Sequence, residues 1–149
     1  MRAFTGRSAG GVSTQVSRTV RGTKKEALRV AAELTVAPAG RAAGRSVIPQ
    51  NAPVSFRYNE DTGTIDIGGY AMGTTRKFAN VAATGVASLV IDDVADPVNW
   101  KVRGIEIRGN AQALRDVEPP TPYMSHEIVR IHPTRIISWG LDETPGQVS

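Results

Sequence analysis

The clearest pattern along the chain is an alternation of apolar and polar side chains in two runs joined by a turn. Residues 54–58 alternate, and residues 64–68 place two isoleucines on one face. The Asn-Glu-Asp-Thr-Gly sequence of residues 59–63 lies between them and is typical of the turns that close β-hairpins. Period-two alternation on both sides of such a turn predicts a β-hairpin over residues 54–68.

A helical spacing replaces the alternation in residues 74–84. Phe78, Val81 and Ala82 share one face of a helix. Gly85 follows at the position where a left-handed residue commonly ends a helix. This segment therefore predicts one short helix between strands.

Three further runs predict strands. Residues 86–91 are apolar and of strand length, and we expect the two aspartates that follow to end that strand. Residues 101–114 alternate over a long stretch, and residues 128–139 predict a last strand that bends where Pro133 removes a hydrogen-bond donor. Strands and a helix in this order predict a mainly β fold, an antiparallel β-barrel with one or two short helices.

Residues 1–48 differ from the rest in composition. They hold nine Lys or Arg and two Glu, a net charge of +7, whereas the remaining residues hold nine basic and twelve acidic side chains, a net charge of −3. Helical spacing predicts a helix over residues 24–34, but apolar content is otherwise low, so we expect a basic segment without fixed structure. A mitochondrial targeting leader and a nucleic-acid-binding arm are the alternatives, although no aromatic residues are interleaved for base stacking.

The composition excludes most built-in catalytic chemistry. The 149-residue chain has no cysteine, which rules out disulfides, thiolate nucleophiles and cysteine-ligated metals, and its two histidines are too few for a multi-histidine metal site. No apolar run approaches the roughly 20 residues of a membrane-spanning helix. We therefore expect a cytoplasmic protein without a metal or membrane partner, which either takes its chemistry from an organic cofactor or binds a ligand without turnover.

One segment concentrates groups that suit an anion. Thr74, Thr75, Arg76 and Lys77 stand at the start of the predicted helix, where free N–H groups and the helix dipole already favour negative charge. Cations at that end are unfavourable unless an anion joins them, so a phosphate site is one interpretation. A simple threonine cap with solvated cations is the other.

Five stretches of sequence follow one another along the chain: APVSFRY (residues 52–58), TGTIDIGG (62–69), TTRKFANV (74–81), RGIEIRGNAQAL (103–114) and IVRIHPTRIISWGLD (128–142). In this order they resemble the FMN-binding split β-barrel family related to pyridoxamine 5′-phosphate oxidase. Within that family they resemble the actinobacterial branch of F420-dependent oxidoreductases. The resemblance predicts a split β-barrel domain over residues 49–142, followed by a flexible tail over residues 143–149.

The resemblance implies a phosphate site at the start of the helix, formed by Thr75, Lys77 and Asn80. It also implies a homodimer in which the cofactor ring lies in a groove between subunits, against a strand segment of one subunit and near Trp139 of the other. The expected cofactor-binding residues are Pro53, Val54, Ser55, Phe56, Thr74, Thr75, Arg76, Lys77, Asn80 and Trp139.

The function implied is that of an oxidoreductase, which transfers hydride between bound F420 and a small organic substrate. An FMN-dependent oxidase or reductase and a non-catalytic cofactor-binding protein are the alternatives. No catalytic acid or base is identified, and nucleic acid is the least favoured partner.

The family's first helix and first strand are not recognisable before residue 49, and the family pattern begins abruptly near residues 48–50. We therefore expect the barrel to lack a strand and to leave a neighbouring strand with an exposed edge. The abrupt join and the charge asymmetry suggest the hypothesis that residues 1–48 are a frame-shifted reading of the gene. The other two reading frames of the encoding DNA test this hypothesis.

Overall fold

The computed structural model describes residues 2–4, 31–37 and 49–141. The C-terminal tail expected over residues 143–149 lies outside them. The elements in chain order are β1 (Arg2–Phe4), β2 (Ala31–Val36), β3 (Gln50–Pro53), β4 (Ser55–Asn59), β5 (Thr64–Gly68), the 3-10 turn η1 (Met72–Thr74), α2 (Arg76–Thr84), β6 (Val86–Asp96), β7 (Lys101–Leu114) and β8 (Ile128–Trp139).

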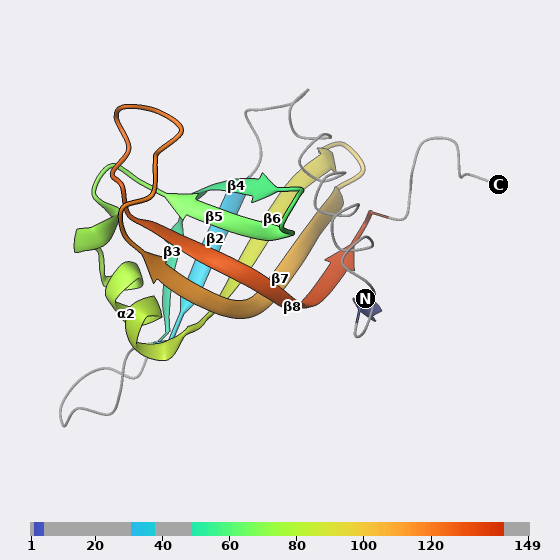
Figure 1. Cartoon of the computed structure of the whole chain (residues 1–149). Helices are drawn as coiled ribbons and strands as arrows, with labels where there is room; N and C mark the ends of the chain where they lie inside the picture. The colour runs from blue at the N-terminus through green and yellow to red at the C-terminus, as the bar shows by residue number, and fades with distance from the viewer. Residues whose placement is uncertain (1, 5–30, 38–48, 142–149) are drawn as a thin grey trace.

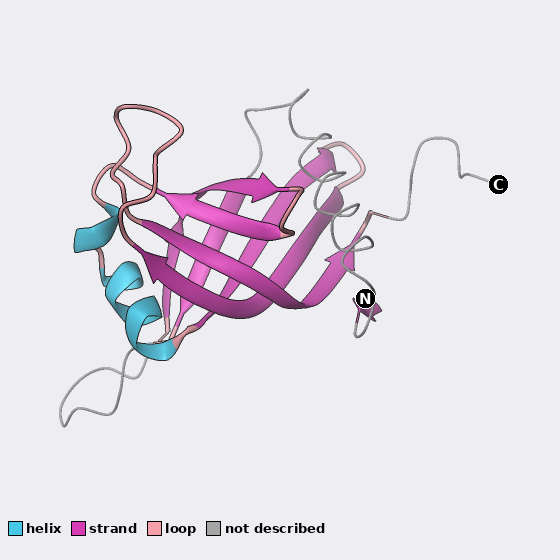
Figure 2. Cartoon of the chain, in the orientation of Figure 1, coloured by secondary structure: helices cyan, strands magenta, loops and turns pink. Residues whose placement is uncertain are grey.

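The strands form one antiparallel sheet that curves around a core. Its order is β3-β2-β6-β7-β8-β5-β4, with β1 paired to β8 outside this path. The curved sheet and the helix α2 at one end of it are visible in Figures 1 and 2. The fold is a split β-barrel, with one α-helix among the described residues, as the alternation and the resemblance predicted. None of the helices in the described residues is long and apolar enough to span a membrane.

The two ends of the strand order are neighbours in the sequence. β3 pairs with β2 and β4 pairs with β5, yet only Val54 separates β3 from β4. The Val54 N–H donates to the Ala32 carbonyl at 2.9 Å, which fixes the bend between the two strands. One short segment of chain thus joins both edges of the sheet and closes the barrel.

Isoleucines dominate the interior of the barrel. Ile65 and Ile67 of β5 are fully buried, as their alternation with polar residues predicted. The helix α2 covers one end with two buried side chains. Removing this apolar area from water provides most of the stabilising free energy. The most deeply buried large side chains are Leu34, Val36, Ile65, Ile67, Met72, Leu89, Ile91, Ile105, Ile107, Ile131 and Ile136.

Several local predictions are confirmed. The hairpin of β4 and β5 closes at Gly63, whose φ is +67°, and α2 ends at Gly85, whose φ is +68°. The strands β7 and β8 have the bounds that their alternation predicted. The bend in β8 is a bulge, because the pairing of β7 with β8 shifts register at Gly109, opposite Pro133.

The expectation of a missing strand before residue 49 is wrong. β2 lies between β3 and β6, and five of its residues pair with β6, so β6 has no exposed edge there. The helix predicted over residues 24–34 is also wrong at its end, because residues 31–34 belong to β2; residues 24–30 lie outside the described residues. Two of the four residues in the stripe behind that helix prediction were alanine, whereas pairing with two strands favours the extended form. The frame-shift hypothesis is no longer supported by a missing strand. It stays untested until the other reading frames of the DNA are compared.

The prediction that two aspartates end the strand after residue 91 is wrong as well. β6 continues to Asp96. Asp93 is buried because Arg103 of the neighbouring strand donates to both of its carboxylate oxygens, at 2.6 and 2.7 Å. A paired charge can be buried inside a hairpin, so the strand does not need to stop.

The bulge at Gly109 leaves no room for a side chain. A Cβ added there would overlap the His132 carbonyl and come within 3.1 Å of the Pro133 Cα. Both are backbone atoms and cannot rotate away. Gly109→Ala is therefore expected to lower the free energy of unfolding by about 1 to 3 kcal/mol, as overpacking does, in urea denaturation.

Gly69→Ala is the matched control for this prediction. A Cβ at Gly69 would meet only the Met72 Cε, at 3.8 Å. We expect a change of less than about 1 kcal/mol. Equal losses in the two variants would contradict the explanation from backbone overlap.

Candidate functional site

Thr75 begins α2 and holds its first turn in place. Its hydroxyl accepts a hydrogen bond from the Phe78 N–H at 3.3 Å and donates one to the Met72 carbonyl at 2.7 Å. Its backbone is extended, as an N-cap residue requires. Phe78 is buried and anchors this turn against the core. The predicted cap is thus present, and it also links the helix to η1.

The start of α2 retains unused hydrogen-bond donors. No described residue accepts a hydrogen bond from the backbone N–H groups of Arg76 and Lys77. The first turn contains no acidic residue. These donors and the helix dipole favour an anion at this end of the helix.

The predicted phosphate-binding residues lie along one short segment. Lys77 and Asn80 are half-buried and, three positions apart, share a flank of α2 next to its buried face. Arg76 is exposed. Thr74 is exposed too, and its hydroxyl donates to the Ala71 carbonyl at 2.9 Å. The fold thus groups Thr75, Lys77 and Asn80 around the helix start, and their role as phosphate ligands stays a prediction.

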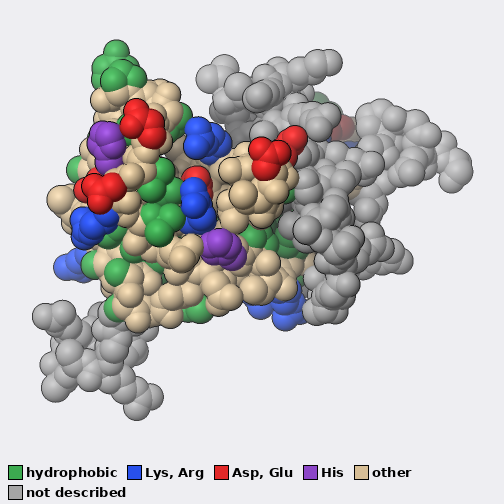
Figure 3. Space-filling model, viewed as in Figure 1, with side chains coloured by type: hydrophobic (Ala, Val, Ile, Leu, Met, Phe, Trp, Pro, Cys, Tyr) green, Lys and Arg blue, Asp and Glu red, His purple; other side chains and the backbone are tan. Residues whose placement is uncertain are grey.

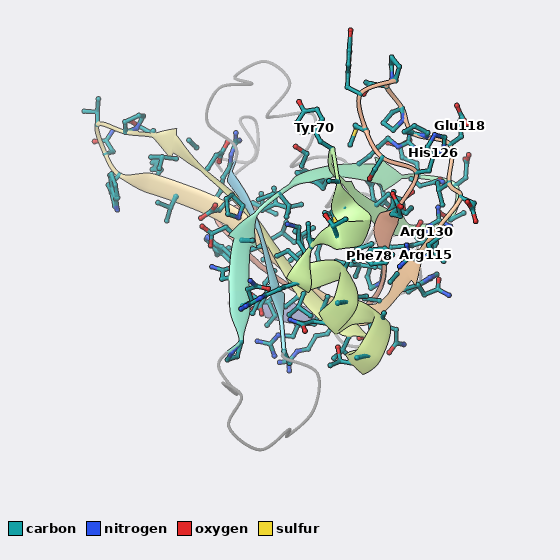
Figure 4. All side chains as sticks on the ribbon, turned by 90° about the vertical axis from the view of Figure 1, so that its left-hand side faces the viewer. Tyr70, Phe78, Arg115, Glu118, His126 and Arg130 are labelled. Carbon is teal, nitrogen blue, oxygen red and sulfur yellow. The ribbon has the colours of Figure 1, made fainter. Side chains whose placement is uncertain are left out.

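Arg115 is a third cation near this helix that sequence reasoning missed. Its guanidinium lies 4.9 Å from the centroid of the Phe78 ring and 3.9 Å from a carboxylate oxygen of Glu127. Figure 4 shows Arg115 beside Phe78. The Glu127 side chain lies against Gly73, where an added Cβ would be 2.9 Å from it. The only signal for Arg115 in the sequence was its place directly after a predicted strand.

Ser125 fastens the loop of residues 115–127 to the segment before α2. Its N–H donates to the Gly69 carbonyl at 2.8 Å, and its hydroxyl accepts from the Met72 N–H at 3.1 Å. The hydroxyl also donates a hydrogen bond to the Gly69 carbonyl at 3.2 Å. The loop and the helix start are therefore held in one fixed arrangement.

A cavity of about 270 Å³ lies between the strands β4 and β5 and the loop of residues 115–127. Two of the residues expected to contact a cofactor ring, Ser55 and Phe56, line it. Of the other two in that strand segment, Pro53 is exposed and Val54 packs against the core. The cavity is lined by Ser55, Phe56, Arg57, Asp66, Gly68, Val117, Glu118, Pro120, Met124, Ser125 and Ile128.

Three charged residues form a row on the outer face of the sheet beside this cavity. Asp66 of β5 is opposite Arg57 of β4 on one side and Arg130 of β8 on the other. Arg130 donates to both oxygens of Asp66, at 2.8 and 3.0 Å, and this pairing raises the pKa of Arg130. Asp66 is only 8% exposed. Figure 3 shows this face, with hydrophobic, acidic and basic side chains side by side.

Trp139 is not close to the helix start within one chain. It ends β8, a 12-residue strand that rises by about 3.3 Å per residue and begins next to the loop of residues 115–127. Its indole covers Gly104 of β7, where an added Cβ would overlap the ring. Its expected contact with a cofactor from the other subunit stays a prediction.

The architecture is one that solved cofactor-binding proteins share. The chain superposes on an F420 reductase with a TM-score of 0.51 and 15% identity over 73% of this chain and 90% of that one. An FMN-binding protein from Syntrophomonas wolfei gives a TM-score of 0.51 and 14% identity over 83% of this chain and 96% of that one. A heme binding protein from Mycobacterium smegmatis gives a TM-score of 0.57 and 11% identity over 95% of this chain and 57% of that one. At these identities the comparisons show the fold alone, a split β-barrel.

The sequence comparison is more specific, although no family model matches the chain. The chain is 44% identical over 100 residues to the 5a,11a-dehydrotetracycline/5a,11a-dehydrooxytetracycline reductase of Streptomyces rimosus, a match that covers 63% of this chain and 67% of the relative. It spans only 53% of a solved Agrobacterium tumefaciens protein of the same fold, Atu2129. The chain belongs to the family of the Streptomyces reductase, and so to the oxidoreductases.

The cap at Thr75 yields a stability prediction. Thr75→Ala removes the bond from the Phe78 N–H and is expected to lower the free energy of unfolding by about 1 kcal/mol. Thr75→Ser keeps the hydroxyl, and its free energy of unfolding is expected to stay close to that of the wild type. Chemical denaturation of both variants provides the measurement, and an unaffected Thr75→Ala protein would show that the cap contributes nothing.

Proposed function

We propose that this protein is an F420-dependent reductase that transfers hydride between the bound coenzyme and a small organic substrate. The observation that carries the proposal is the start of α2. There, the resemblance locates the cofactor's phosphate beside two cations and two N–H groups that donate to no acceptor among the described residues. Family membership supports the reductase class, and the deazaflavin is our choice among the cofactors that this fold accepts.

The residues present suit such a cofactor. Lys77 and Asn80 would contact the phosphate from the flank of α2, and the Arg76 and Lys77 N–H groups would donate to it along the helix axis. Thr75, whose hydroxyl already caps the helix, would position this turn. When bound, the reduced deazaflavin supplies the hydride, while the protein binds and orients it and excludes water.

The ring would lie along the segment from Pro53 to Phe56. This segment joins the two edges of the sheet and is pinned at Val54, so it offers a fixed surface. A homodimer, with Trp139 of the other subunit near the ring, completes the proposed site. The protein would act in the cytoplasm.

The relative's name indicates a class of reaction for this chain. A reductase of a 5a,11a-dehydro compound adds hydrogen across a carbon–carbon double bond of a fused-ring molecule. We propose the same class here, the reduction of an unsaturated ring compound. The particular substrate of the relative is not carried over.

Lys77→Ala tests the phosphate site. The variant is expected to weaken deazaflavin binding by about 1.5 to 3 kcal/mol, the range for a hydrogen bond to a charged group. Fluorescence titration of the purified protein measures the affinity. Lys101→Ala, which removes a lysine at the start of β7, is the matched control and is expected to leave it unchanged.

A parallel titration with FMN tests the choice of cofactor. Saturable binding of the deazaflavin over FMN supports the proposal. Tighter binding of FMN, with the same dependence on Lys77, would replace F420 by FMN in an otherwise unchanged site. Binding of neither cofactor would overturn the proposed function.

A further inference from the structure

We propose that the cavity under the loop of residues 115–127 binds an organic anion with a flat apolar body, and that Arg57 pairs with its negative group. An ionised phenol, enol or aromatic carboxylate attached to fused rings has this chemistry. The assignment deepens the proposed function, because it names the substrate class of the same site. It rests on that function only in calling this ligand the substrate.

The walls of the cavity are mainly apolar. The loop contributes Val117, Pro120 and Met124, and the first residue of β8, Ile128, adds a buried side chain. Ser125 hydrogen-bonds to the segment before α2 and thereby fixes the loop over the sheet. A preformed apolar slot of this kind stabilises a flat hydrocarbon body at little cost in ordering.

The charges on the floor of the cavity favour an anion. Asp66 uses both carboxylate oxygens on Arg130, so its charge is already neutralised. Arg57 stands opposite Asp66 on the next strand but forms no ion pair with any described residue. The floor therefore carries one positive charge in excess, on a side chain that lines the cavity. A guanidinium is well suited to an oxyanion on a planar ligand.

Glu118 provides the opposing charge. It lines the cavity from the loop, is exposed to solvent and has no ion pair with a described residue. Figure 4 shows it on the loop, together with His126. It would repel an anion, so its removal is expected to act in the opposite direction from removal of Arg57. This difference in sign makes the proposal sharply testable.

The size of the cavity limits how much of a ligand it encloses. Its volume of about 270 Å³ lies just below the range of about 300 to 1,000 Å³ typical of small-molecule sites. A molecule of two fused rings fits this space, whereas a larger one extends beyond it. The acidic end of a larger substrate would enter, and the rest would lie toward the segment from Pro53 to Phe56.

The experiment uses two probes with the same ring system and similar shape, the anion 2-naphthoate and its neutral amide, 2-naphthamide. Both are titrated into the full-length protein, without coenzyme, and followed by NMR chemical-shift changes. We expect 2-naphthoate to bind the wild type more tightly than the amide. We expect Arg57→Gln to weaken 2-naphthoate binding by about fivefold, a magnitude reduced by the exposure of the side chain, and to leave the amide unaffected.

Two variants serve as controls. Arg135→Gln removes an exposed arginine of β8 that does not line the cavity, and it is expected to leave both affinities unchanged. Glu118→Gln is expected to tighten 2-naphthoate binding. Thermal unfolding of each variant checks that the fold is retained. Equal effects of Arg57→Gln and Arg135→Gln, or equal affinity of the two probes for the wild type, would overturn the proposal.

Addition of the deazaflavin coenzyme separates this proposal from the proposed function. Binding of 2-naphthoate that persists beside saturating coenzyme supports a substrate position next to the coenzyme within the proposed site. Competitive displacement would assign the cavity to the coenzyme ring and overturn the inference. Arg57-dependent binding of 2-naphthoate to a protein that binds no coenzyme would sustain the cavity assignment while the proposed function fails.

Discussion

The closure of the barrel at Val54 is the constraint on which the rest of the structure depends. β3 and β4 lie at opposite ends of the strand order, yet a single residue joins them, and the Val54 N–H is bonded to Ala32 of β2. The sheet must therefore curve until its two edges meet. This curvature buries the isoleucines inside and turns the outer face of β4, β5 and β8 toward the loop of residues 115–127.

The candidate site depends on a second set of contacts, between that loop and the start of α2. Ser125 bonds the loop to Gly69 and Met72, and Arg115 packs on the ring of Phe78. These contacts hold the loop that lines the apolar cavity against residues 69–73, the segment that leads into the anion-suited helix start. An oxidoreductase whose cofactor performs the chemistry needs this kind of preorganised surface more than it needs catalytic side chains.

The composition explains why the proposed roles are binding roles. The chain has no cysteine and two histidines, and His132 is exposed and bonded to Gln112 at 2.7 Å. The charged groups near the site are one ion pair, Arg130 with Asp66, and two side chains without an ion pair to a described residue, the cation Arg57 and the carboxylate Glu118. Pairs of this type orient ligands and neutralise charge, whereas a proton-transfer catalyst would require a titrating group aimed at the reacting atoms.

The sequence by itself determined the local elements: the hairpin around Gly63, the helix ending at Gly85 and the two long strands of the C-terminal half. Alternation, caps and turns depend on residues close in the chain, so they can be predicted without a structure. β2 could not be predicted in this way, because it is stabilised by pairing with β3 and β6 on both sides. The tertiary structure alone decided the row of Arg57, Asp66 and Arg130, since strand pairing brings together residues more than sixty positions apart. It also placed Arg115 on Phe78 and formed the cavity, because packing between distant elements leaves no periodic signal in the sequence.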